Sequence, residues 1–451
     1  MRLFRRLAAD LHTHVLAISV MTLVIMMGSS VISPVLPLLA QEFGVSYAGA
    51  GALVSAFAVG RIPFDFIGGA LVDRLSPRAI ASGGAAIVTL SAVLSACADS
   101  FAALLWYRLL GGVGSALFVI TAMALLARTV DPQRMGQAMS FYQSMLLLGV
   151  SAGPSVGGFA ANLFHSLHAP FWAMAVLSLI VTVMCLRWIG EFPTSPAAPQ
   201  AAVPAQVATN TPLTHLFSDP TFRFVCVLTF LIFAIRSGLM LNLMPLFAQA
   251  TLGLSETGIG VIQSLSSLAN FCILWHAGRL LDQVGRRRVT LPSLWATAVV
   301  VLLFPWATAL VPLIGASVAF GIVIGYLGPA PAAIIADIAP KEAAGTVMGI
   351  YRMAGDIGLL VGPIAVGWAA GHLGFGVAFA TVAGCTALVA LTGTGVRETL
   401  LPREVHTPAP LAAEEPAASG PLSPRPQGRS LSQAQSVGGE APDNNAQEVA
   451  S

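Results

Sequence analysis

The feature that most restricts the fold of this chain is a short charged loop that occurs twice between long apolar runs. Its first copy contains Gly69, Asp73, Arg74 and Arg78, and its second contains Gly278, Asp282, Gly285, Arg286 and Arg287. The first glycines are 278 − 69 = 209 residues apart, and Gly153-Pro154 recurs at Gly362-Pro363 with the same offset. A constant offset indicates two duplicated halves. Because the loops lie between apolar runs, the repeated unit is a set of membrane helices, as in many carriers.

The composition excludes a water-soluble globule. Of 451 residues, 56% are hydrophobic and 9% are charged, whereas a soluble chain has about 25% charged residues. The net charge of +2 gives no sign of a nucleic-acid partner. The five cysteines all fall in apolar runs without metal-ligand spacing, so the sequence predicts no metal site, no cofactor and no disulfide framework.

The chain has about twelve runs long enough to cross a bilayer, since a membrane helix needs about 20 apolar residues. We therefore expect an all-α membrane protein with twelve transmembrane helices in two pseudo-symmetric six-helix halves. The predicted spans are 15–39, 50–71, 80–98, 102–127, 135–160 and 171–188 in the first half, and 224–247, 259–280, 289–310, 313–335, 346–369 and 375–391 in the second.

Charge and composition divide the chain further. Lys and Arg gather in alternate loops and are absent from the others, so both termini are predicted to be cytoplasmic. The predicted parts are a cytoplasmic segment (1–14), the first half (15–188), a flexible linker (189–222), the second half (223–397) and a disordered cytoplasmic tail (398–451). The first span is too long for a signal-peptide core, and we expect it to remain in the mature protein.

Over roughly residues 10–397 the chain resembles the major facilitator superfamily. The resemblance rests on the two loops, on Arg108 with its following glycines, and on a Gly-Pro helix motif, which comprises Gly149, Gly153, Pro154, Gly157 and Gly158. The first loop departs from the family pattern at Ser76 and Pro77. Ser140 stands where the family's fifth-helix motif has a glycine, so the resemblance to the proton-coupled drug and metabolite antiporter branch is partial.

Each motif also has a physical interpretation. An Asp at the cytoplasmic end of a helix can accept hydrogen bonds from Arg or from a neighbouring helix N-terminus, and breaking them would let the halves move. The alternative is a plain cluster of charges that orients the chain. The glycines of the Gly-Pro motif, with Gly362 and Pro363 in the second half, are predicted to let helices pack closely.

Four charges inside predicted spans form candidate pairs, since each should face protein or a water-filled cavity. They are Arg61, Asp65, Arg352 and Asp356. In the resembled fold the second and eleventh helices are neighbours, and the depths match Asp65 with Arg352 and Arg61 with Asp356 as a gate that couples protons. The alternative is two private pairs on single helices, Arg61–Asp65 and Arg352–Asp356.

Arg108 and Arg236 have no acid within one turn of their own helices. The resemblance places both helices beside the transport pathway, and two arginines without a carboxylate favour an anionic or strongly polar substrate. A structural role for Arg108 at a glycine-rich crossing is the alternative. Further candidate contacts to the substrate are Gln143, Asn242 and Tyr326.

The resemblance implies a secondary active transporter that exports a small organic solute by alternating access, with protons as coupling ion. The alternatives are a proton-coupled importer of an organic acid or other metabolite, and a membrane sensor that does not transport. The sequence contains no P-loop, no His-Glu-x-x-His pattern and no nucleophile elbow, so no catalytic residue and no enzyme activity is predicted. We expect a monomer in the bilayer of the bacterial inner membrane.

Overall fold

The computed structural model describes residues 13–130, 135–189, 219–338 and 344–399, and these form helices without any strand. Twelve runs of helix are long and apolar enough to cross a membrane, which confirms the predicted all-α fold with twelve spans. The helices of the first set are α2 (Thr13–Val31), α3 (Leu36–Glu42), α4 (Tyr47–Arg74), α5 (Pro77–Ala96), α6 (Phe101–Thr129), α7 (Met135–Leu163) and α8 (Ala169–Trp188). The second set comprises α10 (Pro220–Ile235), η2 (Arg236–Leu243), α11 (Met244–Leu252), α12 (Glu256–Val284), α13 (Arg286–Leu303), η3 (Phe304–Trp306), α14 (Leu310–Leu327), α15 (Ala330–Ile338), α16 (Ala344–Leu373) and α17 (Phe375–Gly393).

Three of the predicted spans are interrupted. The first turns at residues 32–35 between α2 and α3, next to Pro34. The seventh changes from α-helix to π-helix at Arg236 and returns to α-helix at Met244. The tenth breaks at Gly328-Pro329 between α14 and α15. A proline removes a backbone donor, which accounts for the first and third breaks.

Short polar residues start several helices. Ser46, Ser76, Ser100 and Ser255 are N-caps whose hydroxyls accept a backbone N–H three residues on. Such caps satisfy donors that a helix start leaves free. Gly253 ends α11 with a φ of +60°, a conformation that side chains disfavour. Serine caps and a glycine stop therefore fix where these membrane helices begin and end.

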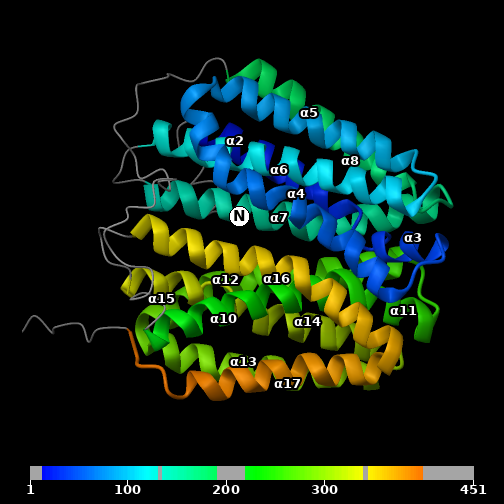
Figure 1. Cartoon of the computed structure of the whole chain (residues 1–451), viewed down its shortest axis with the longest axis vertical. Helices are drawn as coiled ribbons and strands as arrows, with labels where there is room; N and C mark the ends of the chain where they lie inside the picture. The colour runs from blue at the N-terminus through cyan, green and yellow to red at the C-terminus, as the bar shows by residue number, and fades with distance from the viewer. Residues whose placement is uncertain (1–12, 131–134, 190–218, 339–343, 400–451) are drawn as a thin grey trace, which may run out of the picture. The chain divides into compact units, whose positions relative to one another are not determined.

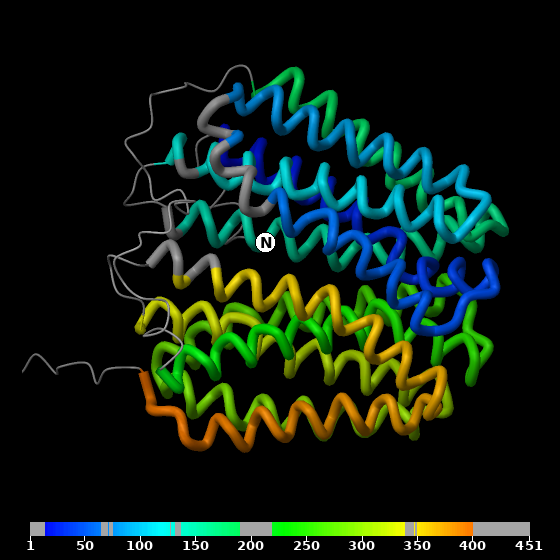
Figure 2. The backbone as a smooth tube through the Cα atoms, in the orientation of Figure 1, coloured from blue at the N-terminus to red at the C-terminus, as the bar shows by residue number. Residues whose placement is uncertain are grey.

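The two sets lie side by side, with the first from blue to green and the second from green to orange in Figure 1 and Figure 2. They meet mainly along two helix pairs, α7 with α12 and α4 with α16, and α4 also contacts η2 while α3 contacts α11. We call the end of the bundle where α12 meets α13 the loop-motif end, and the end with the turns at 43–46 and 253–255 the opposite end. The two pairs join the duplicated halves.

Hydrogen bonds between described residues join the two sets toward the opposite end. They run from Ser33 Oγ to Gln263 Oε1, from Ser55 Oγ to the Leu360 carbonyl, from Ser155 N to Ser264 Oγ, and from Thr257 Oγ1 to the Gly158 carbonyl. Toward the loop-motif end, Gln143 on α7 and Arg352, Met353 and Ile357 on α16 are exposed. The described hydrogen bonds therefore join the two sets toward the opposite end.

Glycines allow this close packing. A Cβ on Gly149, Gly153 or Gly157 of α7 would overlap backbone or side-chain atoms of α2, and one on Gly158 would overlap the Glu256 carbonyl of α12. On α16, Gly362 lies equally close to Ala234 of α10. The structure thus places the Gly-Pro motif at helix crossings.

Large apolar side chains cover the outer faces of the helices. Trp106, Trp275 and Trp306 are 65%, 61% and 77% exposed. A soluble protein rarely exposes so much apolar surface, whereas a bilayer accommodates it. These faces agree with an integral multi-pass membrane protein.

Candidate functional site

Arg236 is the first residue of the π-helix η2 in the seventh span. Its side chain is only partly exposed, and burial is the one influence on its guanidinium within the described part of the chain, with no hydrogen bond and no charged partner. A buried charge without a partner is costly, so such residues in membrane spans are usually functional. π-Helical turns occur frequently at functional sites. Arg236 is therefore a candidate binding group for an anion.

Asn242 belongs to the same π-helix, but its side chain faces protein. Its Nδ2 donates to the Pro363 carbonyl on α16 at 2.9 Å, and its Oδ1 is buried without a hydrogen-bond partner among the described residues. With the side chain 0% exposed, Asn242 fixes η2 against α16 in this closed arrangement. The structure does not bring it next to open space.

Arg108 on α6 is 6% exposed. Its guanidinium carbon lies 4.8 Å from the ring centroid of Phe57 on α4, a cation–π contact. Its Nε has no hydrogen-bond partner among the described residues. The aromatic ring offsets part of the burial of the charge, while the Nε donor stays unpaired among the described residues.

Two of the four intramembrane charges approach one region. The phenol of Tyr142 on α7, only 1% exposed, interacts electrostatically with both Arg61 on α4 and Arg352 on α16. Arg352 and Asp356 precede Pro363 by eleven and seven residues, so the helical period places all three on one face. That face contacts α4, since Gly51 packs on the Pro363 carbonyl. The side chain of Asp65 lies outside the described residues.

The remaining two substrate candidates lie apart. Gln143 is exposed on α7 toward the loop-motif end. The Tyr326 hydroxyl lies 2.9 Å from Nδ1 of His276 on α12, and its ring packs against Leu281 and Val289. These contacts hold Tyr326 between α12, α13 and α14 rather than beside Arg236.

The second loop motif forms a charged network at the loop-motif end. Arg286 pairs with Asp282 and, at 3.1 Å, with Asp337 on α15. The carboxylate of Glu398 accepts the backbone N–H groups of Arg286 and Arg287 at the start of α13. The sequence predicts that Asp282 accepts hydrogen bonds either from an arginine or from the N-terminus of a neighbouring helix. The structure pairs it with the arginine and gives the helix start to Glu398.

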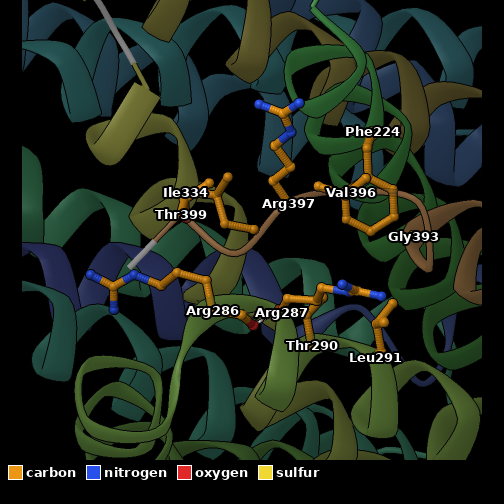
Figure 3. A pocket seen from close by; sticks show the side chains of 10 residues that line it. All are labelled: Phe224, Arg286, Arg287, Thr290, Leu291, Ile334, Gly393, Val396, Arg397 and Thr399. Atoms are coloured by element: carbon orange, nitrogen blue, oxygen red, sulfur yellow. Dashed lines mark hydrogen bonds between the residues drawn. The ribbon is translucent and has the colours of Figure 1, made fainter. Parts of the chain in front are cut away.

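This network also changes the predicted start of the tail. Glu398 and Thr399 fall within the predicted disordered tail, but both are bound, Thr399 to Asp337 at 3.1 Å. A small pocket lies beside them. In Figure 3 the guanidinium groups of Arg286, Arg287 and Arg397 point in three different directions. The three charges therefore do not form a common anion site.

The first loop motif is described mostly as backbone, since Gly69, Asp73 and Arg74 lie in the last turns of α4. The side chains of Asp73 and Arg74 are outside the description, and Arg78 is exposed beside the Ser76 cap of α5. In the second copy, Gly278 has open space around it and Gly285 adopts a φ of +122°, which favours glycine. Gly285 therefore permits the turn between α12 and α13.

A pocket of about 470 Å³ lies at the opposite end. Its lining is polar and includes Glu42, Asn162, His165, His168 and Glu256, from the ends of α3, α7 and α12. Two carboxylates and no Lys or Arg line it, so an anion is not favoured there. Within the described residues, no group of three or more His, Cys, Asp or Glu side chains could hold a metal ion.

Sequence reasoning missed Tyr142 and Gln263. The same 209-residue offset pairs Tyr142 with Tyr351, which lies beside Arg352. The repeat of a tyrosine at both positions is the sequence feature from which Tyr142 could have been found. No sequence pattern points to Gln263, because its hydrogen bonds depend on the turn between α2 and α3 and on the π-helix η2.

A bundle of twelve membrane-spanning helices in two sets, with Arg108 and Arg236 inside the spans, is the architecture of a membrane transporter. A family model described as Major Facilitator Superfamily matches residues 18–275 and 225–434, and the chain belongs to that superfamily.

Similar proteins and a solved structure agree with this family assignment. The multi-drug resistance efflux pump PmrA of Streptococcus pneumoniae is 25% identical over 373 residues, which span 80% of this chain and 90% of PmrA. The quinolone resistance protein NorA of Staphylococcus aureus is 26% identical over 166 residues, which span 36% of this chain and 42% of NorA. A D-xylose–proton symporter structure has a TM-score of 0.69 at 18% identity, covering 85% of this chain and 98% of the symporter. Two of the three, the PmrA pump and the symporter, are named as transporters.

Proposed function

We propose that this protein exports a small organic compound with an acidic or strongly polar group, in exchange for protons, by alternating access. The single observation behind the substrate class is Arg236, whose partly buried guanidinium has no charged or hydrogen-bonding partner among the described residues. A carboxylate bound there supplies the missing counter-charge through two parallel hydrogen bonds. Arg108 adds a second positive charge.

Export is supported by the names of the relatives, since PmrA is an efflux pump and NorA confers quinolone resistance. In the proposed orientation the loop-motif end is cytoplasmic, as the positive charges of the loops indicate, and the membrane is the bacterial inner membrane. The carboxylates of Glu42 and Glu256 then line the outer pocket. These negative charges repel a departing anion and so disfavour its return to the binding site.

Protons are the proposed coupling ion because carboxylates lie inside the spans. Asp65 and Asp356 are the acidic residues that the sequence analysis pairs with arginines of the other half. A desolvated carboxyl group takes up a proton more readily than one in water. Protonation would weaken its attraction for Arg61 or Arg352, and would so link proton binding to the movement of the two sets.

The test uses a fluorescent quinolone, norfloxacin, which has the carboxylate that Arg236 is proposed to bind. Everted membrane vesicles and right-side-out vesicles with the protein are given an imposed pH gradient without ATP. We expect accumulation in the everted vesicles, driven by an acid interior. Accumulation only in right-side-out vesicles would show import, and a requirement for ATP or indifference to pH and Na⁺ gradients would refute proton coupling.

A further inference from the structure

The side-chain amide of Gln263 on α12 joins the two sets through both of its polar atoms. Gln263 is 3% exposed. Its Nε2 donates to the Met240 carbonyl of η2 at 2.7 Å, and its Oε1 accepts from Ser33 Oγ at 2.8 Å. Ser33 lies in the turn between α2 and α3 of the first set. One buried amide thus contacts the π-helix and the opposite set at once.

The Met240 carbonyl needs an outside donor because its own helix supplies none. In η2 the Met244 N–H is already bound to the Leu239 carbonyl, five residues earlier. The next donor in this pattern is residue 245, which is a proline and has no N–H. A buried carbonyl without a donor is unfavourable. Gln263 Nε2 therefore replaces the hydrogen bond that Pro245 removes.

The π-helix matters for the side chain at its start. A π-helical turn contains about one residue more than an α-helical turn, so loss of the π-helix rotates the preceding residues by roughly 100°. Arg236 is the first residue of η2. The direction of its guanidinium therefore depends on whether the π-helix is kept.

We propose that Gln263 is a positioning residue that couples closure of the opposite end to the π-helical geometry of η2, and through it to the direction of Arg236. When the sets separate at this end, Ser33 moves away and the amide is no longer fixed. Nε2 then leaves the Met240 carbonyl, and η2 is free to rearrange. The coupling between closure of the opposite end and the geometry of η2 requires only that the protein alternates between two states. Its effect on substrate binding rests on the function proposed for Arg236.

The experiment follows backbone amide exchange of residues 236–246 by mass spectrometry, on the full chain in lipid nanodiscs without substrate. Gln263→Leu should raise the exchange rate of this segment about tenfold, because a buried carbonyl loses its donor. Adding Pro245→Ala should return the rate to near that of the unchanged protein, since the alanine N–H supplies a donor within the helix. If Gln263→Leu acted only by disturbing the packing, Pro245→Ala would not restore the exchange rate. Gln263→Met, which is close in size but lacks the donor, replaces the leucine variant if that variant does not fold.

The coupling between the sets is tested at Ser33. Ser33→Ala, which removes no contact to η2, should raise exchange in 236–246 about threefold, in line with the loss of one hydrogen bond. The matched control is Ser30→Ala, because Ser30 bonds only within the first set, to the carbonyls of Met27 and Gly149. Equal exchange in Ser33→Ala and Ser30→Ala would overturn the coupling. Unchanged exchange in Gln263→Leu, or no rescue by Pro245→Ala, would overturn the role of Gln263. Because no substrate is present, these outcomes do not depend on the transport assay.

Discussion

At the scale of single residues, the two buried arginines differ in what surrounds them. Arg108 has the ring of Phe57 at 4.8 Å, and a cation–π contact is worth about 0.5–2 kcal/mol. Arg236 has no comparable contact among the described residues. A ligand therefore gains more by pairing with Arg236 than with Arg108.

Arg236→Ala should lower norfloxacin transport more than tenfold, and Arg236→Lys should retain a measurable fraction. Lysine keeps the charge but lacks the planar pair of donors that binds a carboxylate. The control is Arg279→Ala, since Arg279 is exposed on α12 and stacks on Trp275. Initial rates of pH-driven uptake into everted vesicles provide the measurement. Full activity of the alanine variant, with a permanent cation as substrate, would contradict the assignment.

At the scale of helices, the closest packing occurs where glycine faces backbone. On α7, Gly157 lies against the Val31 carbonyl at the end of α2, immediately before the turn that contains Ser33. Small residues at a crossing let helices in a membrane approach closely. The crossing of α2 and α7 therefore also fixes where the cross-set hydrogen bond of Ser33 forms.

Gly157→Ala should destabilise the protein by about 1–3 kcal/mol, because the added methyl group forces α2 and α7 apart. Gly315→Ala on α14 is the control, since nothing lies within 4 Å of its added Cβ and alanine favours a helix. Thermal unfolding in detergent, followed by tryptophan fluorescence, compares the two. Equal midpoints for both variants would show that this crossing tolerates more space than the contact implies.

At the scale of the whole molecule, the proposed alternating access requires a second state, in which the hydrogen bonds that join the two sets toward the opposite end are broken. The sets are joined toward the opposite end by hydrogen bonds such as Ser33–Gln263, while Arg352 is exposed toward the loop-motif end. In the other state the loop-motif end closes. The pairs Asp65–Arg352 and Arg61–Asp356 are the proposed contacts of that state, and Tyr142 already interacts with both arginines here.

Asp65→Asn should shift the population toward the state that is open at the loop-motif end and slow transport. Loss of one member of a buried pair costs about 3–5 kcal/mol, enough to move most of a balanced population. Exchanging the charges, as Asp65→Arg with Arg352→Asp, should restore part of the transport rate. Distances between spin labels at Gln137 and Val284, both exposed near that end, report the state. Additive effects of Asp65 and Arg352 in a double-mutant cycle, with strong coupling of Asp65 to Arg61, would favour the private pairs.

The sequence by itself was sufficient for the class of fold. Membrane spans are determined by local composition, because each helix must satisfy its own backbone hydrogen bonds in lipid, and the 209-residue repeat showed the two halves. The unpaired state of Arg236 was also foreseeable, since no acid lies within a turn on its helix. The spans and the lack of an acid beside Arg236 depend on residues near one another in the chain, and the two halves are visible as a repeat in the sequence itself.

Other features depended on contacts between distant residues. The hydrogen bond that Gln263 donates to Met240 and the binding of Glu398 to the start of α13 each join separate segments of the chain. The pairing of Tyr326 with His276 placed a predicted substrate contact between helices instead. A hydrogen bond between helices is determined by their relative depth and rotation, and these follow from the packing of the whole bundle. Only the tertiary structure could decide them.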